Sequence, residues 1–377
     1  MSEISTTHHE QSTHEWLIDA LGGEVDGPLD RVLARPTERD CELIIPLSAR
    51  SVTVSALQRN HDDRSAKTRL ISSIGRSAGR LGMLHRAGGD IASFPCTAVV
   101  RAIRSCLGEP NLSVAIAAGP PRRNRKPVLM LIRPDGEVVG FAKVGWSDFT
   151  NQLVGNEYAA LQDVDGKLVA PLKSPRPIEL LEVDGRVAAV TTAIRSLSWV
   201  RPRALTPAQI DTISEIGRRR LPIADLEWLA SPDIGDKDDI AQQALERAVL
   251  GVPQAFGSHS LDVGRWHGDL NRWNLITTHT SVSVIDWEFS GLDRPVGHDR
   301  RHLRFEATRR NTGRTAAESV AEFVDAELQG RSSRVELAVY LADLAIRESR
   351  LSGQGWSGAM AGFRLPLTVA LEELTTS

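Results

Sequence analysis

The segment from residue 111 to residue 195 restricts the possible folds of this chain most strongly. It contains five short apolar stretches, which read LSVAIAAG, PVLMLIR, VVGFAKVG, PIELLEV and VAAVTTAI. Apolar stretches joined by tight turns such as PDGE and DGR are typical of antiparallel strands. Between the third and fourth stretches, FTNQLVGNEYAALQDV has the spacing of a helix. One face of this predicted helix consists of Leu153, Glu157, Ala160, Leu161 and Val164.

The chain after residue 196 has the pattern of a helical domain. Four segments are predicted to be helices, and they read TPAQIDTISEIGRRRL, DKDDIAQQALERAVLG, TAAESVAEFVDAELQG and SSRVELAVYLADLAIRESRLSG. The last two of these are expected to be the final long helices of the chain. We therefore expect an α+β protein with a small antiparallel-sheet lobe over residues 111–195 and a larger helical lobe over residues 196–377.

Residues 1–110 are expected to form an N-terminal extension of unknown role. Within it, CELIIPL predicts a short buried strand, and RSAKTRLISSIGRSAGRLG predicts a basic helix over residues 64–82. The extension could complete the sheet, cover an acceptor pocket or mediate self-association, and the sequence does not decide between these.

The overall charge argues against nucleic acid and membranes as partners. Lys and Arg number 45 and Asp and Glu 48, which gives a net charge of −3. The first residues lack the pattern of a signal peptide, and no apolar run is long enough to span a bilayer. The three cysteines are too widely spread for a zinc site. We expect a cytoplasmic protein, with nucleic-acid binding by the basic stretches 64–82 and 122–126 as the weakest alternative.

A polar cluster stands out at residues 265–275, which read RWHGDLNRWNL and are followed by SVSVIDWEFSG. Polar groups at this density are costly to bury without partners, so the segment is either a solvated loop or a site. The stretch WNLITTHTSVSVID is expected to form a hairpin that brings Asn274 and Asp286 to one end. An amide oxygen and a carboxylate suit magnesium, and Asp269 would then orient or deprotonate a hydroxyl group.

The cluster and two earlier residues resemble the aminoglycoside phosphotransferase and choline kinase family, which has a two-lobed protein-kinase-like fold. The resemblance rests on HGDLNRWN and IDWE, preceded by Lys143 in the strand GFAKVG and by Glu157 on the following helix. It implies that Asp269 is the catalytic base and that Asn274 and Asp286 bind Mg²⁺. Lys143 would contact the phosphates of ATP and be held by Glu157.

The same resemblance assigns supporting roles and a reaction. His267 would brace the catalytic loop by hydrogen bonding, and Asp299 in DRPVGHD would anchor the turn into the next helix. The implied reaction transfers the γ-phosphoryl group of ATP, with Mg²⁺, to a hydroxyl group of a small molecule. The acceptor could be an aminoglycoside, or a sugar, an amino alcohol or another metabolite.

One part of the sequence departs from the kinase pattern. The turn AAGPPRRNRKP over residues 117–127 has one glycine and three prolines, and proline has no N–H group to offer a phosphate. The side chains of Arg122, Arg123, Arg125 and Lys126 could supply charge instead. This departure keeps open a second class of protein, a pseudokinase that binds nucleotide without transferring phosphate. The tryptophans beside the acidic residues, Trp266, Trp273 and Trp287, are expected to pack in the core.

Overall fold

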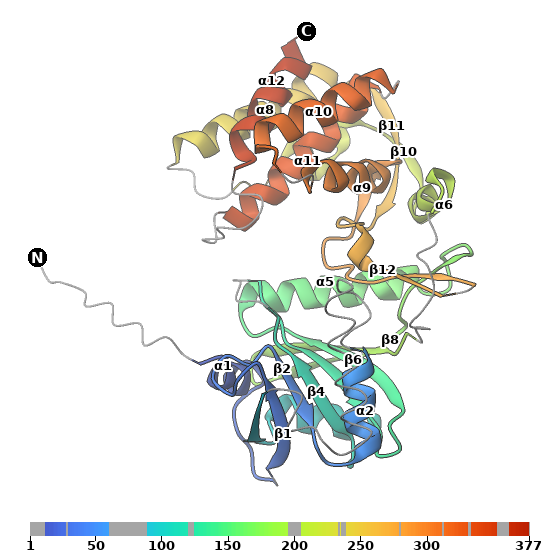
Figure 1. Cartoon of the computed structure of the whole chain (residues 1–377). Helices are drawn as coiled ribbons and strands as arrows, with labels where there is room; N and C mark the ends of the chain where they lie inside the picture. The colour runs from blue at the N-terminus through green and yellow to red at the C-terminus, as the bar shows by residue number, and fades with distance from the viewer. Residues whose placement is uncertain are drawn as a thin grey trace, which may run out of the picture. The chain divides into compact units, whose positions relative to one another are not determined.

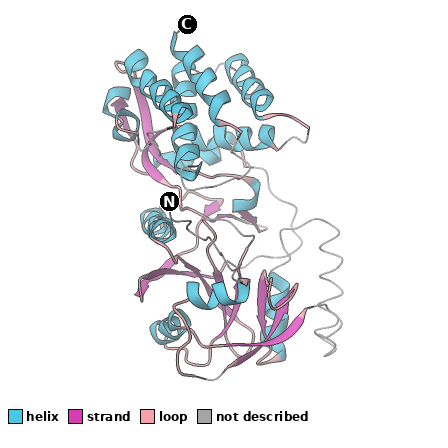
Figure 2. Cartoon of the chain, turned by 90° about the vertical axis from the view of Figure 1, so that its left-hand side faces the viewer, coloured by secondary structure: helices cyan, strands magenta, loops and turns pink. Residues whose placement is uncertain are grey.

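The computed structural model of the chain describes residues 12–27, 29–59, 89–119, 124–194, 205–232, 234, 239–278, 280–310, 313–330, 333–352 and 362–376. The chain divides into two compact units, Met1–Asp165 with Pro175–Val200, and Gly166–Ser174 with Arg201–Ser377. Strands predominate in the first unit and helices in the second (Figures 1 and 2). The expected boundary after residue 195 falls outside the described residues. No sequence pattern indicated that the short segment Gly166–Ser174 belongs to the second unit.

The first unit is built on an eight-stranded antiparallel sheet with the strand order β3-β1-β2-β4-β5-β6-β9-β8. The strands are β1 (Asp30–Arg35), β2 (Leu43–Pro46), β3 (Asp90–Phe94), β4 (Ser113–Ala117), β5 (Val128–Ile132), β6 (Val138–Val144), β8 (Pro177–Val183) and β9 (Arg186–Thr192). The three-strand meander β4-β5-β6 and the hairpin β8-β9 confirm the strands predicted from the apolar stretches. The strands β1, β2 and β3 continue the same sheet, so the described part of the first hundred residues enlarges it.

Helices cover both faces of this sheet. They are α1 (Thr13–Ala20), α2 (Arg50–Arg59), α4 (Ala98–Leu107) and α5 (Asp148–Val164). Because neighbouring strand residues point to opposite faces, Leu33 packs in one buried cluster with Val52 of α2 and Val32 packs in another with Val99 of α4. The predicted helix is confirmed as α5, which begins with a capping box between Ser147 and Thr150.

The second unit consists mainly of helices around one apolar core, to which α8, α9, α10, α11 and α12 contribute. The helices are α6 (Pro207–Asp211), α7 (Glu227–Ala230), α8 (Ile240–Phe256), α9 (His298–Arg309), α10 (Ala316–Gln329), α11 (Arg334–Ser352) and α12 (Arg364–Thr376). Two small sheets accompany them, β10 (Arg219–Pro222) with β11 (Ser260–Trp266) and β14 (Gly291–Pro295), and β7 (Leu172–Lys173) with β12 (Leu275–Thr277) and β13 (Val282–Val284). The predicted α+β class, with a sheet unit and a helical unit, is confirmed.

Two predictions about the second unit were wrong in detail. The long helix expected from residue 206 stops early, because a 3₁₀ turn at Thr212–Glu215 leads to Gly217, whose φ of +70° is left-handed. The residues that follow form β10, which pairs with β11 instead of extending the helix. The final long helix is α12 and not α11. The predicted basic helix over 64–82 lies outside the described residues.

No helix among the residues that the structure describes is long and apolar enough to cross a membrane.

Candidate active site

In the first unit, Lys143 and Glu157 form a buried ion pair. Lys143 lies on β6, and its Nζ is 2.8 Å from Oε1 and 2.7 Å from Oε2 of Glu157. Glu157 lies on the buried face of α5, and only 8% of its side chain is exposed. A charged partner offsets the cost of burying this carboxylate, and the two short contacts fix the position of the lysine head group. This is the contact that the family resemblance implies.

In the second unit, the loop after β11 is tied to the start of α9. The Oδ2 atom of Asp299 accepts the backbone N–H of His267 at 2.8 Å, and Oδ1 accepts that of Gly268 at 3.2 Å. Burial raises the pKa of Asp299 to about 7, although the two N–H groups oppose this shift. Gly268 has a φ of +90°, and a Cβ atom there would lie 2.2 Å from the backbone oxygen of Phe289. Only glycine fits this turn.

His267 is held inside the loop by both ring nitrogens. Its Nε2 donates to the backbone oxygen of Ile285 at 2.9 Å, and its Nδ1 accepts the backbone N–H of Asp269 at 3.2 Å. The ring packs against Trp287 with a centroid distance of 4.6 Å. Burial lowers the pKa of His267 to about 4, so the ring is neutral near pH 7. An imidazole with both nitrogens occupied braces the loop and is not free to transfer protons.

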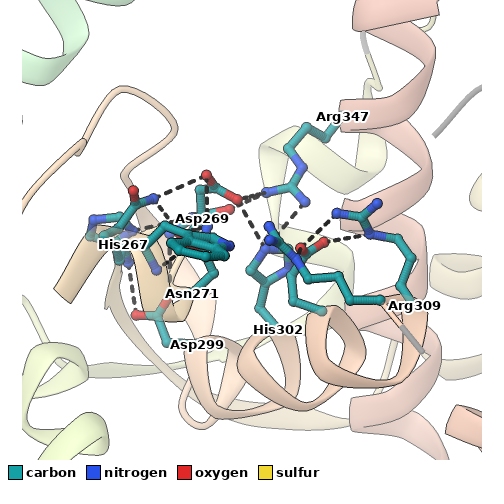
Figure 3. Close-up of polar contacts among 12 residues, drawn as sticks. His267, Asp269, Asn271, Asp299, His302, Arg309 and Arg347 are labelled. Carbon is teal, nitrogen blue, oxygen red and sulfur yellow. Dashed lines mark hydrogen bonds and ion pairs between the residues drawn. The ribbon is translucent and has the colours of Figure 1, made fainter. Parts of the chain in front are cut away.

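Asp269 lies at the centre of a network of polar side chains (Figure 3). Its Oδ2 accepts hydrogen bonds from Nδ2 of Asn271 at 3.2 Å and from Nδ2 of Asn274 at 3.1 Å. Its Oδ1 faces Nε2 of His302 at 3.2 Å, and the guanidinium group of Arg347 is 3.9 Å away. The carboxylate is fixed by several donors, yet 29% of the side chain remains exposed.

Three of these partners were not predicted from the sequence. Asn271 lies inside the quoted motif and could have been found by its place two residues after Asp269. His302 on α9 and Arg347 on α11 have no local sequence signal, because only the folded chain brings them to the loop.

Asn274 and Asp286 lie at the open end of the hairpin β12-β13, as predicted. Leu275 pairs with Val284, and the N–H of Ile285 donates to the backbone oxygen of Asn274 at 3.0 Å. Since Nδ2 of Asn274 points to Asp269, its amide oxygen points away from that carboxylate. Asp286 has a left-handed backbone with a φ of +69°, a conformation that is concentrated at functional sites. The amide oxygen and the carboxylate fit the oxygen ligands that Mg²⁺ prefers.

The expectations for the three tryptophans are confirmed in part. Trp266 and Trp287 are buried as expected, whereas Trp273 is 39% exposed and so does not belong to the core. In the proline-rich turn, residues 122 and 123 lie outside the described residues. The Nε of Arg125 donates to the backbone oxygen of Ala118 at 2.9 Å, and its guanidinium group stacks on Trp16.

Replacing Asp299 by asparagine should destabilise the second unit. Asparagine keeps one oxygen but turns an NH₂ group toward a backbone N–H, so a buried donor loses its acceptor. We expect the free energy of unfolding to fall by about 1–3 kcal/mol, as measured by chemical denaturation. Asp325→Asn, an exposed change on α10, is the matched control and should have little effect. Equal stability of the two variants would contradict the anchoring role of Asp299.

Part of the chain resembles a known protein family. Residues 133–297 match the family model of the phosphotransferase enzyme family, APH. A search of curated protein sequences gives no significant match.

Three solved structures illustrate the structural likeness. Aminoglycoside phosphotransferase APH(4)-Ia is 11% identical over 73% of this chain and 99% of its own, with a TM-score of 0.49. Amicoumacin kinase hAmiN, solved with AMP-PNP and Ca²⁺, is 13% identical over 71% of this chain and 88% of its own, with a TM-score of 0.41. A choline/ethanolamine kinase family protein from Mesorhizobium loti is 16% identical over 66% of this chain and 85% of its own, with a TM-score of 0.36.

The matched segment contains Lys143, Glu157, His267, Asp269, Asn274 and Asp286. The resemblance that the sequence motifs predicted is confirmed, since residues 133–297 match the phosphotransferase enzyme family.

Proposed function

We propose that this protein is a Mg-ATP-dependent phosphotransferase that phosphorylates a hydroxyl group of a small molecule. The observation that carries this proposal is the arrangement of donors around Asp269. A carboxylate offers about four lone-pair directions. The two asparagine amides occupy those of Oδ2, and His302 occupies one of Oδ1. The remaining direction on Oδ1 suits the hydroxyl group of an acceptor.

The proposed step follows from this arrangement. The acceptor hydroxyl donates its proton to Asp269, and its oxygen attacks the γ-phosphorus of ATP. The bond between that phosphorus and the bridging oxygen to the β-phosphorus breaks, and ADP leaves. Asn274 and Asp286 would hold Mg²⁺, which when bound offsets negative charge on the phosphates. Lys143, positioned by Glu157, would bind phosphates of ATP.

The neutral His267 has a purely structural part in this proposal. It sets the path of the loop between β11 and Asp269, so that the catalytic carboxylate meets its two amide donors. Phosphoryl transfer depends mainly on positioning and charge stabilisation, with little covalent chemistry for the protein to perform. A rigid loop of this kind serves that need.

Asp269→Asn should abolish transfer while leaving nucleotide binding intact. Asparagine preserves the shape of the side chain but cannot accept the proton of the acceptor. We expect kcat to fall about 10²- to 10⁴-fold, with the affinity for Mg-ATP changed little. ADP formation in the presence of an acceptor panel measures kcat, and calorimetry measures the affinity for Mg-ATP. Unchanged turnover would remove Asp269 from the role of base, and ATP binding with no transfer in the wild type would favour a pseudokinase.

Asp286→Asn should remove the dependence of nucleotide binding on Mg²⁺. Asparagine tolerates the left-handed backbone at this position, so the change removes the charge without straining the turn. We expect the affinity for an ATP analogue with Mg²⁺ to fall at least about tenfold, and the affinity measured in EDTA to stay the same. If calorimetry gives equal losses in both conditions, the assignment of Asp286 as a metal ligand is wrong.

A further inference from the structure

Arginine side chains from three parts of the second unit lie near the loop of Asp269 or near residues that contact it. Arg347 extends from α11 toward Asp269 and His302 (Figure 3), and its Nη1 also donates to the backbone oxygen of Gly268. Arg309, the last residue of α9, and Arg310, which follows it, contribute two more guanidinium groups. Arg272 contributes a fourth from the loop of Asp269 itself.

Glu306 on α9 brings two of these arginines together. Its carboxylate accepts from Nε and Nη2 of Arg309 at 2.8 and 2.6 Å and from Nε of Arg310 at 3.0 Å. Burial raises the pKa of Glu306, but the arginine hydrogen bond and the nearby charges of His302, Arg309 and Arg347 outweigh it and lower the pKa to about 2. Glu306 is therefore ionised, and its single negative charge is shared between the guanidinium groups of Arg309 and Arg310.

The exposed Trp273 connects this group to the catalytic loop. The guanidinium group of Arg272 lies 4.4 Å from the centre of its ring, and that of Arg310 lies 5.7 Å away. Arg272 has no ion-pair partner within the described part of the chain. The end of α9 and the loop of Asp269 thus present arginines to the same surface, beside an aromatic ring.

The tautomer of His302 decides what Arg347 can still bind. Its Nδ1 is 3.2 Å from the hydroxyl group of Tyr340, and its Nε2 faces both Asp269 at 3.2 Å and Nη2 of Arg347 at 3.4 Å. A lone pair on Nε2 would face the negative oxygen of Asp269, so Nε2 carries a proton and donates to it. Tyr340 then donates to Nδ1. A protonated Nε2 cannot accept from Arg347, which leaves the Nη2 donor of Arg347 without an acceptor in His302.

The arginine group and the two carboxylates that contact it have a positive balance. Arg272, Arg309, Arg310 and Arg347 carry four positive charges, and Glu306 and Asp269 carry two negative charges, so the balance of these six side chains is +2. Burial and the charge of Arg347 lower the pKa of His302, so it adds no charge near pH 7. A cationic acceptor such as an aminoglycoside or choline would meet repulsion here, whereas a carboxylate or a phosphate matches the guanidinium fork.

We propose, building on the phosphotransferase function, that the acceptor is an anion whose carboxylate or phosphate group is bound by Arg347 and Arg310 beside Asp269. Arg347 fixes the anionic group close to the base, and Arg310 and Trp273 form the outer side of the same subsite. The acceptor is thus a hydroxy acid or a phosphate ester with a free hydroxyl group. The site selects it from neutral sugars and amino alcohols by charge.

An acceptor panel tests this proposal with the full-length protein and Mg-ATP. Its arms are hydroxy acids, sugar and polyol phosphates, neutral sugars and polyols, and amino alcohols with aminoglycosides. Mass spectrometry identifies phosphorylated products, and the first two arms distinguish a carboxylate from a phosphate as the recognised group. Transfer to anionic compounds supports the proposal. Transfer only to neutral or cationic compounds overturns it and leaves the phosphotransferase function intact.

Variants of the arginines test whether these residues bind the acceptor. We expect Arg347→Gln and the more exposed Arg310→Gln each to raise the KM of an anionic acceptor at least about tenfold, with the KM for ATP unchanged. Arg314→Gln is the control of equal charge, because Arg314 pairs with Glu322 on α10. Equal KM values for all three variants would overturn the proposal.

A binding measurement covers the case in which no compound is phosphorylated. Calorimetry with a non-hydrolysable ATP analogue present, using the anionic compounds and inorganic phosphate as probes, reports the anion subsite without turnover. Binding that is lost in Arg347→Gln and kept in Arg314→Gln supports the subsite even if the transfer function fails. Binding that is absent, or equal in both variants, overturns it.

Discussion

Two backbone hydrogen bonds to the buried carboxylate of Asp299 hold the loop on which the rest of the site depends. They join the end of β11 to the start of α9 and set the direction of the chain at His267 and Gly268. Gly268 permits the turn, and His267 then fixes the loop to the hairpin through Ile285. Asp269 is presented to its partners only because this turn is closed.

The neighbours of Asp269 hold its carboxylate in one position. Two amides, one imidazole and a nearby guanidinium group surround a single carboxylate and leave one oxygen partly open. The amide of Asn274 has two parts in the proposal, since its nitrogen donates to Asp269 and its oxygen would bind the proposed cation. In a reaction where alignment of the attacking oxygen matters more than strong basicity, such a crowded site is an advantage. In the proposed function, Arg347 and Arg310 would position the acceptor in the same way.

The parts of the fold that local pattern determines could be predicted from the sequence. Strand alternation and turn residues gave β4, β5, β6, β8 and β9, and helical spacing gave α5 with Glu157 on its buried face. The hairpin β12-β13, and with it the pairing of Asn274 and Asp286 at one end, followed from a short segment. The helix expected after Thr206 failed because its later residues pair with β11, a partner that local propensity does not reveal.

The residues that the sequence did not reveal reach the site from far along the chain. His302 is 33 residues from Asp269, and Arg347 is 79 residues from Gly268. Each lies on a helix whose pattern reflects packing against the core, so nothing in that pattern marks the polar residue at its edge. They are also the basis of the proposed anionic acceptor, whereas the motifs alone suggested a family that includes cationic substrates.

In the proposed reaction, a phosphoryl group passes directly from ATP to a hydroxyl group of the acceptor. Incubation with Mg-ATP carrying ¹⁸O on the γ-phosphoryl group, followed by mass spectrometry of the acceptor, tests this most directly. We expect the labelled phosphoryl group to appear, ester-linked, on the acceptor at the same rate as ADP forms. Label found only in inorganic phosphate, at a rate that no acceptor changes, would contradict it.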